Sequence, residues 1–244
     1  MTACIFVALS WFFASAASSA AGVGVVMLST PVVSLFIPPA QAVLVACLVS
    51  SVWVFLQFAS YRHSASFKEV LALGIGSLPG CACGALVLKT APMALLELCV
   101  AAMIAIFLVL QAIPRRTTSL PASKGLDLGA GFVAGLTAAS VGMDGPPLAI
   151  YSLIRGWSPD EARANMSAFF IFTTVGCIAS QAAAGLYSMD IAPLIMAGIL
   201  GALPGHKLGV YLGKHLSYVA FRRLLMGFLF CASCSLAYRG IMDF

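Results

Sequence analysis

The sequence contains few charged residues. Asp, Glu, Lys and Arg together make up 9% of its 244 residues, whereas hydrophobic residues make up 61%. A water-soluble domain carries roughly a quarter of charged residues, so this chain cannot cover a surface that faces water. Its 13 Lys and Arg are scattered and do not form the basic clusters that bind nucleic acid. The composition predicts an integral membrane protein and excludes a nucleic-acid-binding protein.

The residue patterns of enzymes and metal sites are also missing. Neither Gly-x-Ser-x-Gly nor His-Glu-x-x-His occurs, and His63, His206 and His215 fall on different segments or in loops. Most of the eight Cys lie inside apolar runs, and the Cys81-Ala82-Cys83 stretch lacks the spacing of a zinc or thioredoxin motif. We therefore predict no cofactor, no metal site, no structural disulfide and no enzymatic activity.

Eight long apolar stretches follow one another, and a bilayer crossing takes about 20 apolar residues. They cover residues 3–37, 40–60, 68–88, 93–113, 126–154, 162–186, 190–212 and 218–241. A polar, basic segment bracketed by Pro114 and Pro121 lies at the centre. We predict a first membrane repeat over residues 1–113, a cytoplasmic linker over 114–125 and a second membrane repeat over 126–244. The first twenty residues lack the basic start of a secretory signal, so we expect them to form a mature membrane segment.

The two halves share a phrase. Residues 76–84 read GSLPGCACG and residues 201–209 read GALPGHKLG, which places the second copy 125 positions after the first. With a shift of 120 instead, Phe12 falls on Phe132 and Pro39 on Pro159. Matched Pro and Gly positions of this kind are hard to obtain by chance, and many membrane transporters are built from internal repeats. The chain is therefore predicted to contain a duplication.

The distribution of basic residues predicts how the repeats are oriented. If all eight stretches cross the membrane, six Lys and Arg lie on one side and seven on the other. In the other arrangement, the first stretch turns back at residues 22–24 and Pro31, and the fifth turns back at residues 142–147. Eleven Lys and Arg then lie on one side of the membrane, and two, Lys89 and Arg239, lie on the other. Cytoplasmic loops carry the excess of basic residues. We predict an all-α integral membrane protein of two inverted repeats, each a re-entrant helical hairpin plus three transmembrane helices. Both termini would lie outside; a plain eight-crossing bundle is the alternative.

The two hairpin tips are the candidate substrate site. A helix that starts at a tip presents free backbone amides and a partial positive charge, which suits an anion. The predicted substrate-binding residues are Gly22, Val23, Gly24, Gly142, Gly145 and Pro146, with hydroxyls from Ser29, Thr30 and Ser140. A purely structural kink at each tip is the alternative.

Asp144 is the most informative single residue. It lies in the second tip within an apolar context, where a carboxylate is costly unless it is paired or hydrated. It is predicted either to couple or gate transport through a proton, beside the substrate, or to cap the amides after Gly145.

The repeated Pro-Gly phrases predict helix breaks that act as hinges, because proline removes an amide from the helix. The hinge or gating candidates are Pro79, Gly80, Pro204, Gly205 and His206. The alternative is that Gly76, Gly80, Gly84 and their counterparts form small-residue packing faces. Four polar side chains within the crossings are expected to make interhelical hydrogen bonds, namely Gln57, Glu97, Asn165 and Gln181. Ser158 to Glu161 reads as a helix start.

Over about residues 5–240 the chain resembles the sulfite exporter TauE/SafE family, also called the TSUP family. The resemblance is carried by residues 21–24 followed by Pro31, by the phrase at 76–84, and by Gly142-x-x-Gly145-Pro146 followed by Tyr151. It implies a permease of the bacterial inner membrane that exports sulfite, sulfoacetate or related organosulfonates. Asp144 stands where the family pattern has Gly, which indicates proton coupling particular to this member.

These observations together predict a secondary transporter of small sulfur-bearing anions. Its predicted partners are the anion, the lipid bilayer and protons, while the oligomeric state is not predicted. The alternatives are an anion channel, an uptake permease for another small organic acid, and a membrane scaffold that does not transport.

Overall fold

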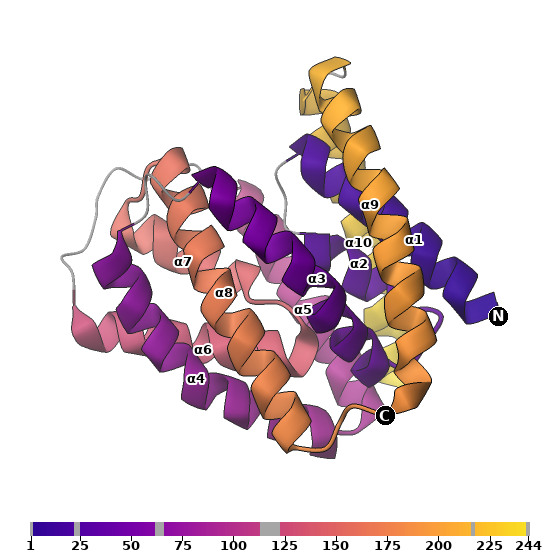
Figure 1. Cartoon of the computed structure of the whole chain (residues 1–244), viewed down its shortest axis with the longest axis horizontal. Coiled ribbons are helices and arrows are strands. Elements are labelled where there is room, and N and C mark those ends of the chain that lie inside the picture. The colour runs from indigo at the N-terminus through magenta and orange to yellow at the C-terminus, as the bar shows by residue number, and fades with distance from the viewer. Residues whose placement is uncertain (1, 22–24, 62–65, 113–122, 216–217, 243–244) are drawn as a thin grey trace. The chain divides into compact units, whose positions relative to one another are not determined.

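The computed structural model describes residues 2–21, 25–61, 66–112, 123–215 and 218–242, and these residues form helices and no strands (Figure 1). In the first half the helices are α1 (Thr2–Ala21), α2 (Val25–Val33), α3 (Pro39–Tyr61), α4 (Phe67–Thr90) and α5 (Met93–Ala112). In the second half they are α6 (Lys124–Val141), α7 (Gly145–Arg155), α8 (Pro159–Ala183), the short 3-10 helix η2 (Met189–Ile191), α9 (Ala192–His215) and α10 (Tyr218–Met242).

The first and fifth apolar stretches are each divided into two helices, whereas each of the other six forms one long helix. The division in the fifth stretch has a local cause. Gly142 adopts the left-handed conformation with φ 74°, and its amide donates to the Ala138 carbonyl at 3.0 Å, which ends α6. Pro146 and Pro147 in the first turn of α7 then start a new helix. Residues 22–24, where the first stretch is predicted to turn, lie outside the described residues.

Both divided stretches turn back on themselves. The Tyr151 hydroxyl on α7 donates to Asp127 Oδ1 near the start of α6 at 2.7 Å, so α7 returns along α6. In the first stretch the ring of Phe36, just after α2, stacks on that of Phe6 near the start of α1, with centroids 4.3 Å apart. Each divided stretch is therefore a helical hairpin whose end lies near its beginning.

The prolines do not break their helices, which corrects the expectation for the Pro-Gly phrases and for Pro31. Pro79 lies inside α4, Pro204 inside α9 and Pro31 inside α2. Proline removes one amide from a helix, but the turns on either side keep their hydrogen bonds. Neighbouring helices can hold the segment in place. The physical role of the repeated phrase is found in its glycines.

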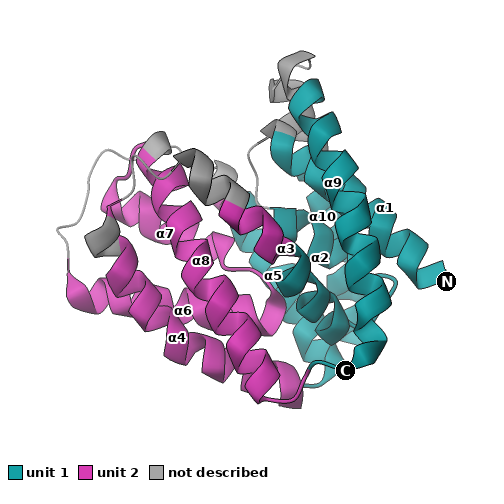
Figure 2. Cartoon of the chain, in the orientation of Figure 1, with its two compact units in different colours: residues 1–49, 91–108, 187–244 teal, residues 50–90, 109–186 magenta. Residues whose placement is uncertain are grey.

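The chain forms two compact units (Figure 2), and each takes helices from both halves of the sequence. Unit 1 consists of residues 1–49, 91–108 and 187–244, and unit 2 consists of residues 50–90 and 109–186. The predicted repeat boundaries concern the duplication of the sequence and not these units, so they remain a prediction.

In unit 2, α4 packs against α6 through its glycine face, which we define as Gly76, Gly80 and Gly84. A Cβ atom at any of the three would overlap a backbone carbonyl of α6. The residues that they face, in order, are Leu128, Phe132 and Leu136. The numbers rise together, so the two helices run parallel, and only glycine permits this close approach.

Unit 1 repeats this arrangement with α9 and α1. The glycine face of α9 consists of Gly201, Gly205 and Gly209, and it meets the backbone of Ala8, Phe12 and Ala16. The α9 glycines lie 125 positions after the α4 glycines, and the α1 residues that they face lie 120 positions before the corresponding α6 residues. These are the same two shifts that relate the halves of the sequence. The packing alternative for these glycines is therefore confirmed, and the two helix pairs share one register.

Contacts between α4 and α8 show that these helices run parallel as well. Cys81 Sγ lies 3.6 Å from Cys177 Sγ, and further along both helices Lys89 Nζ donates to the Ala184 carbonyl at 2.7 Å. The Lys89 contact provides a hydrogen bond for a carbonyl at the C-terminal end of α8. A cation at this end also interacts favourably with the helix dipole.

In unit 1, α5 and α10 run antiparallel. Ser233 Oγ on α10 donates to the Ala101 carbonyl on α5 at 3.0 Å, and Arg239, further along α10, lies 3.3 Å from Glu97, earlier on α5. The start of α5 therefore lies beside the end of α10.

These directions disagree with the plain eight-crossing bundle. In that arrangement α4 and α8 are the third and sixth crossings and would be antiparallel, while α5 and α10 are the fourth and eighth and would be parallel. The observed directions require the α6–α7 hairpin to return to the side from which it began, because it is the one hairpin that lies between the helices compared. For the first stretch, the stacking of Phe36 on Phe6 is the observation that supports a return. The inverted relation of the two halves across a membrane remains a prediction.

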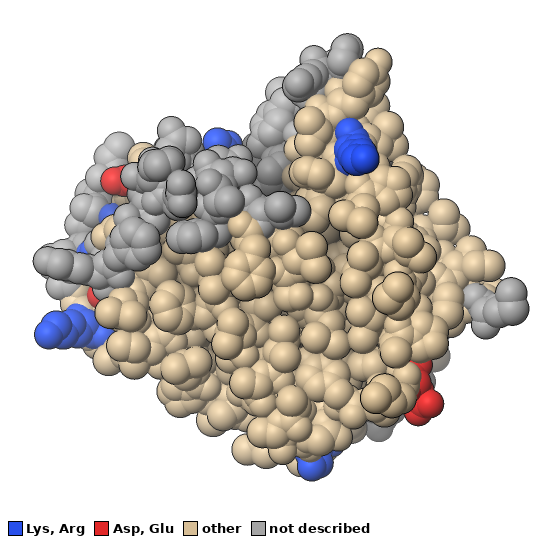
Figure 3. All heavy atoms as spheres, in the orientation of Figure 1, with Lys and Arg blue, Asp and Glu red and all other residues tan. Residues whose placement is uncertain are grey.

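Apolar side chains cover much of the described surface. Phe13 is 66% exposed and Leu200 is 65% exposed, and on the face drawn in Figure 3 charged atoms appear at only a few places. Among the described residues, five helices are long and apolar enough to cross a membrane, within residues 2–19, 70–90, 93–110, 161–183 and 189–212. Shorter apolar segments lie at residues 39–55 and 229–242. Such a surface suits contact with lipid.

The glycine faces yield a stability prediction. We expect Gly80→Ala and Gly205→Ala to destabilise the protein by ~2 kcal/mol or more, because the added methyl group forces the paired backbones apart. Thermal unfolding of the purified protein in detergent measures the effect. Gly129→Ala on α6 is the control, since a Cβ there has no neighbour within 4 Å. Equal melting temperatures for Gly80→Ala and Gly129→Ala would show that the close contact does not stabilise the fold.

Candidate functional site

The candidate site is the tip of the α6–α7 hairpin, residues 142–147, in unit 2. Met143 is fully buried at the tip, and Pro146 at the start of α7 is buried as well. Asp144 occupies the position before the first residue of α7 and is partly buried.

The Asp144 side chain does not cap α7. It makes no capping hydrogen bond, and its Oδ2 atom instead accepts a hydrogen bond from Thr173 Oγ1 on α8 at 2.8 Å. The cap interpretation is therefore wrong, and the sequence of α7 explains why. Pro146 and Pro147 carry no amide hydrogen, so two of the donors that a cap would satisfy do not exist. The carboxyl group is directed across to another helix.

The same two prolines limit how α7 can hold an anion. Of its first three residues, only Gly145 has an amide hydrogen to offer. The partial positive charge of a helix start resides mainly in such unsatisfied amides. Any anion at this tip must therefore rely on side-chain donors as well as on the backbone.

Thr173 links the tip to the interface between α4 and α8. Its hydroxyl lies 2.8 Å from Asp144 and 3.3 Å from the Phe170 carbonyl, so its single proton has two alternative acceptors. Its own carbonyl lies 3.9 Å from the Cys81 sulfur. The sequence analysis missed Thr173, because no motif or spacing relates it to a residue 29 positions earlier.

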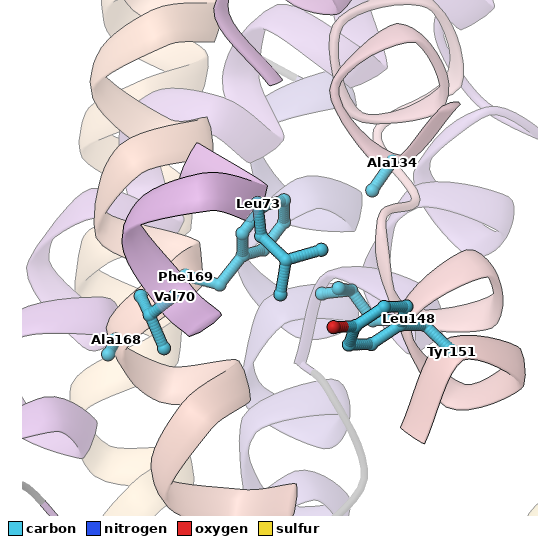
Figure 4. Close-up of a cluster of buried hydrophobic side chains, with 7 residues drawn as sticks. All are labelled: Val70, Leu73, Ala134, Leu148, Tyr151, Ala168 and Phe169. Carbon is cyan, nitrogen blue, oxygen red and sulfur yellow. The ribbon is translucent and has the colours of Figure 1, made fainter. Parts of the chain in front are cut away.

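A buried cluster packs the hairpin against α4 and α8 (Figure 4). Its members come from α4, α6, α7 and α8 and are Val70, Leu73, Ala134, Leu148, Tyr151, Ala168 and Phe169. Tyr151 also packs edge-on against Trp157, with ring centroids 5.2 Å apart, and its hydroxyl binds the buried Asp127. The sequence analysis overlooked Asp127 because it lies in the first turn of a helix, where acidic residues are common. Its contact fixes α7 against α6.

The hydroxyls predicted to join the site bond mainly to their own helices. Ser140 donates to the Leu136 carbonyl at 2.7 Å, and Ser29 lies 3.4 Å from the Val26 carbonyl. Thr30 is buried, and its hydroxyl has no hydrogen-bond partner among the described residues. Gly22, Val23 and Gly24 lie outside the described residues, so the first tip and its role remain predictions.

The hinge and gating candidates occupy the closely packed helix pairs. Pro79 and Gly80 lie on α4, while Pro204 and Gly205 lie on α9. His206 Nδ1 lies 2.7 Å from Ser19 Oγ, near the end of α1. His206 is the counterpart of Cys81 at the shift of 125, but His206 contacts α1, whereas Cys81 contacts α8. Their roles in movement remain predictions.

Three of the polar residues predicted within crossings do make contacts between segments. Gln181 donates to the Ala139 carbonyl at 3.1 Å, Asn165 Oδ1 accepts from the Ser66 amide at 2.7 Å, and Glu97 pairs with Arg239. The side chain of Gln57 is not described. Ser158 and Glu161 form a reciprocal capping box, which confirms the predicted start of α8.

Comparison with known families gives one match. The model of the family described as sulfite exporter TauE/SafE matches residues 7–236, whereas no curated protein and no solved structure matches the chain. The match spans both hairpins and both glycine faces. The resemblance found in the sequence is thereby confirmed, and the chain belongs to the sulfite exporter TauE/SafE family of multi-pass membrane transporters.

Proposed function

We propose that this protein is a secondary transporter that moves sulfite, sulfoacetate or related organosulfonates across the bacterial inner membrane, normally outward. Membership of the TauE/SafE family supports the class of substrate. The observation that carries the mechanism is the carboxyl group of Asp144, held by Thr173 at the tip of the α6–α7 hairpin.

We also propose that the halves are inverted repeats. Two hairpins that turn back leave three long helices in each half, and an odd number of crossings inverts the second half. The parallel α4 and α8 and the antiparallel α5 and α10 support the return of the second hairpin, and the stacking of Phe36 on Phe6 supports the return of the first. Inverted repeats whose sites contain interrupted helices are a common architecture of secondary transporters.

The chemistry of the tip supports coupling to protons. An ionised Asp144 would repel an anion that approaches the Gly145 amide, because two like charges in an apolar site disfavour each other. A proton on Asp144 removes this repulsion and converts the carboxyl group into a hydrogen-bond donor for the anion. Thr173 can stabilise either form, since its hydroxyl can donate to the carboxylate or to the Phe170 carbonyl. The anion and the proton would thus bind together, and net transport is outward where the outward gradient of the anion exceeds the inward gradient of protons.

Flux into proteoliposomes tests the role of Asp144. We expect saturable transport of sulfite and sulfoacetate that a pH gradient drives in the wild-type protein. Asp144→Asn mimics the protonated carboxyl group, so we expect it to keep exchange of anions but to lose the drive by the pH gradient.

The outcomes separate the candidate functions. Saturable flux that ignores both the pH gradient and Asp144→Asn would contradict proton coupling through this residue while retaining the transporter. Flux that does not saturate would favour an anion channel. A wild-type protein that moves no sulfur anion would contradict the proposed substrate class.

Thr173 gives a second prediction. We expect Thr173→Val to reduce the rate of coupled transport about tenfold, because the carboxyl group loses the hydroxyl that positions it. Thr173→Ser keeps the hydroxyl and should retain most of the activity. Initial rates in proteoliposomes are the measurement, and Thr174→Val is the matched control on the same helix. If Thr173→Val and Thr174→Val have equal rates, the hydrogen bond to Asp144 has no role in transport.

A further inference from the structure

A second carboxyl group, that of Glu97, is buried in unit 1. It lies in the second turn of α5, and its side chain is fully buried. Within the described part of the chain, neither of its oxygens accepts a hydrogen bond. Its partner is a cation, since Arg239 Nη2 lies 3.3 Å from Glu97 Oε1. A buried carboxylate of this kind depends on that one positive charge.

Arg239 is much more accessible than its partner. It lies in the last turn of α10, and its side chain is 39% exposed. Its Nη1 atom also donates to the Ser34 carbonyl, just after α2, at 3.4 Å. A guanidinium has five N–H donors, so these two contacts leave donors with which to bind a further acceptor. Arg239 therefore joins the end of α2, the start of α5 and the end of α10 at one level of unit 1.

The neighbouring residues show why the pair is close. Gly240 lets α10 approach α5, because a Cβ there would lie 2.8 Å from Leu98 Cγ and 3.1 Å from the Ala94 carbonyl. The other titratable groups on these elements are thiols and a phenol, namely Cys99 on α5 and Cys231, Cys234 and Tyr238 on the same part of α10. The sequence of α2 contains no titratable side chain. Glu97 and Arg239 are thus the charged groups at this place in the described structure.

Stability does not explain this pair. A buried ion pair is often no more stabilising than apolar residues of similar size, although loss of one partner is costly. The chain has only eight acidic residues, and one of them is placed where its charge is hardest to maintain. Lys89 can be compared with Arg239, because Lys89 donates a hydrogen bond to the Ala184 carbonyl at the end of α8. Arg239 likewise donates a hydrogen bond to the Ser34 carbonyl just after α2, and it also pairs with the Glu97 carboxylate.

We propose that Arg239 is an anion-binding residue at one mouth of the transporter and that Glu97 is the internal carboxylate which the transported anion displaces. When an anion binds the guanidinium, the Glu97–Arg239 pair breaks. The buried carboxylate then takes up a proton from water, because an unpaired charge there is unfavourable. Anion and proton bind in one event at this site. The inference rests on the proposed transport of anions, but it concerns a site in unit 1 separate from Asp144.

Binding of methanesulfonate to the purified protein tests the inference, because this anion does not titrate near neutral pH. The measurements use the Asp144→Asn background, so that Asp144 cannot contribute protons. We expect binding to weaken as pH rises, since ionised Glu97 then competes for Arg239. Glu97→Gln should bind about tenfold more tightly than its parent at alkaline pH and should lose the pH dependence.

Variants at the cation and a matched control complete the experiment. Arg239→Gln should abolish the binding, and Arg239→Lys, which keeps the charge but loses the planar fork, should weaken it. Ser233→Ala removes a neutral hydrogen bond between the same two helices and should bind like its parent. Addition of methanesulfonate to a weakly buffered sample should raise the pH of the parent solution but not that of Glu97→Gln.

Three results would overturn the inference. One is a pH dependence that is unchanged in Glu97→Gln, and another is wild-type affinity in Arg239→Gln or Arg239→Lys with only a lower melting temperature. Either would leave the proposed transporter intact and make the pair purely structural. The third is an absence of methanesulfonate binding to the parent protein, which would contradict the inference. If the wild-type protein also moves no sulfur anion, the proposed function is overturned as well.

Discussion

The structure depends on the close contact of two helix pairs through glycine. On α4 and on α9, three glycines at intervals of four residues let a parallel helix approach until backbone meets backbone. Between apolar helices in lipid there is little hydrophobic drive for association, so such close packing is a main source of attraction. The partner helices, α6 and α1, are the first arms of the two hairpins. The glycine faces therefore hold the hairpins, and with them the candidate site.

A second constraint is the cost of charge in an apolar environment. Several charged groups of the described structure have specific partners. Lys89 and Arg239, the two cations that the sequence predicts to lie on the side with few basic residues, both bond to carbonyls at helix ends. Asp127 accepts a hydrogen bond from the Tyr151 phenol, and Asp144 accepts one from the Thr173 hydroxyl. Both of these partners are neutral, and a neutral partner stabilises a carboxylate less than a cation does.

The two proposed sites would use the same principle with different groups. At the α6–α7 tip, two prolines reduce the amides available to an anion, and the carboxyl group stands beside the site. In unit 1, a guanidinium supplies the attraction and a buried carboxylate competes for it. In both cases binding of an anion favours a proton on the carboxyl group, because an uncompensated charge is costly away from water. Coupling would thus follow from local electrostatics and would need no cofactor.

The sequence by itself determined the class of protein, its family, the division of the first and fifth apolar stretches, and the register of the duplication. These features follow from composition, from Gly and Pro at fixed spacing, and from shifts of 120 and 125 that reappear in the helix contacts. Only the tertiary structure decided that the Pro-Gly phrases continue as helix, since an isolated sequence does not show which helix supports a missing hydrogen bond. It also decided which side chains meet. Thr173 reaches Asp144, and Arg239 reaches Glu97, across sequence separations that no local pattern encodes.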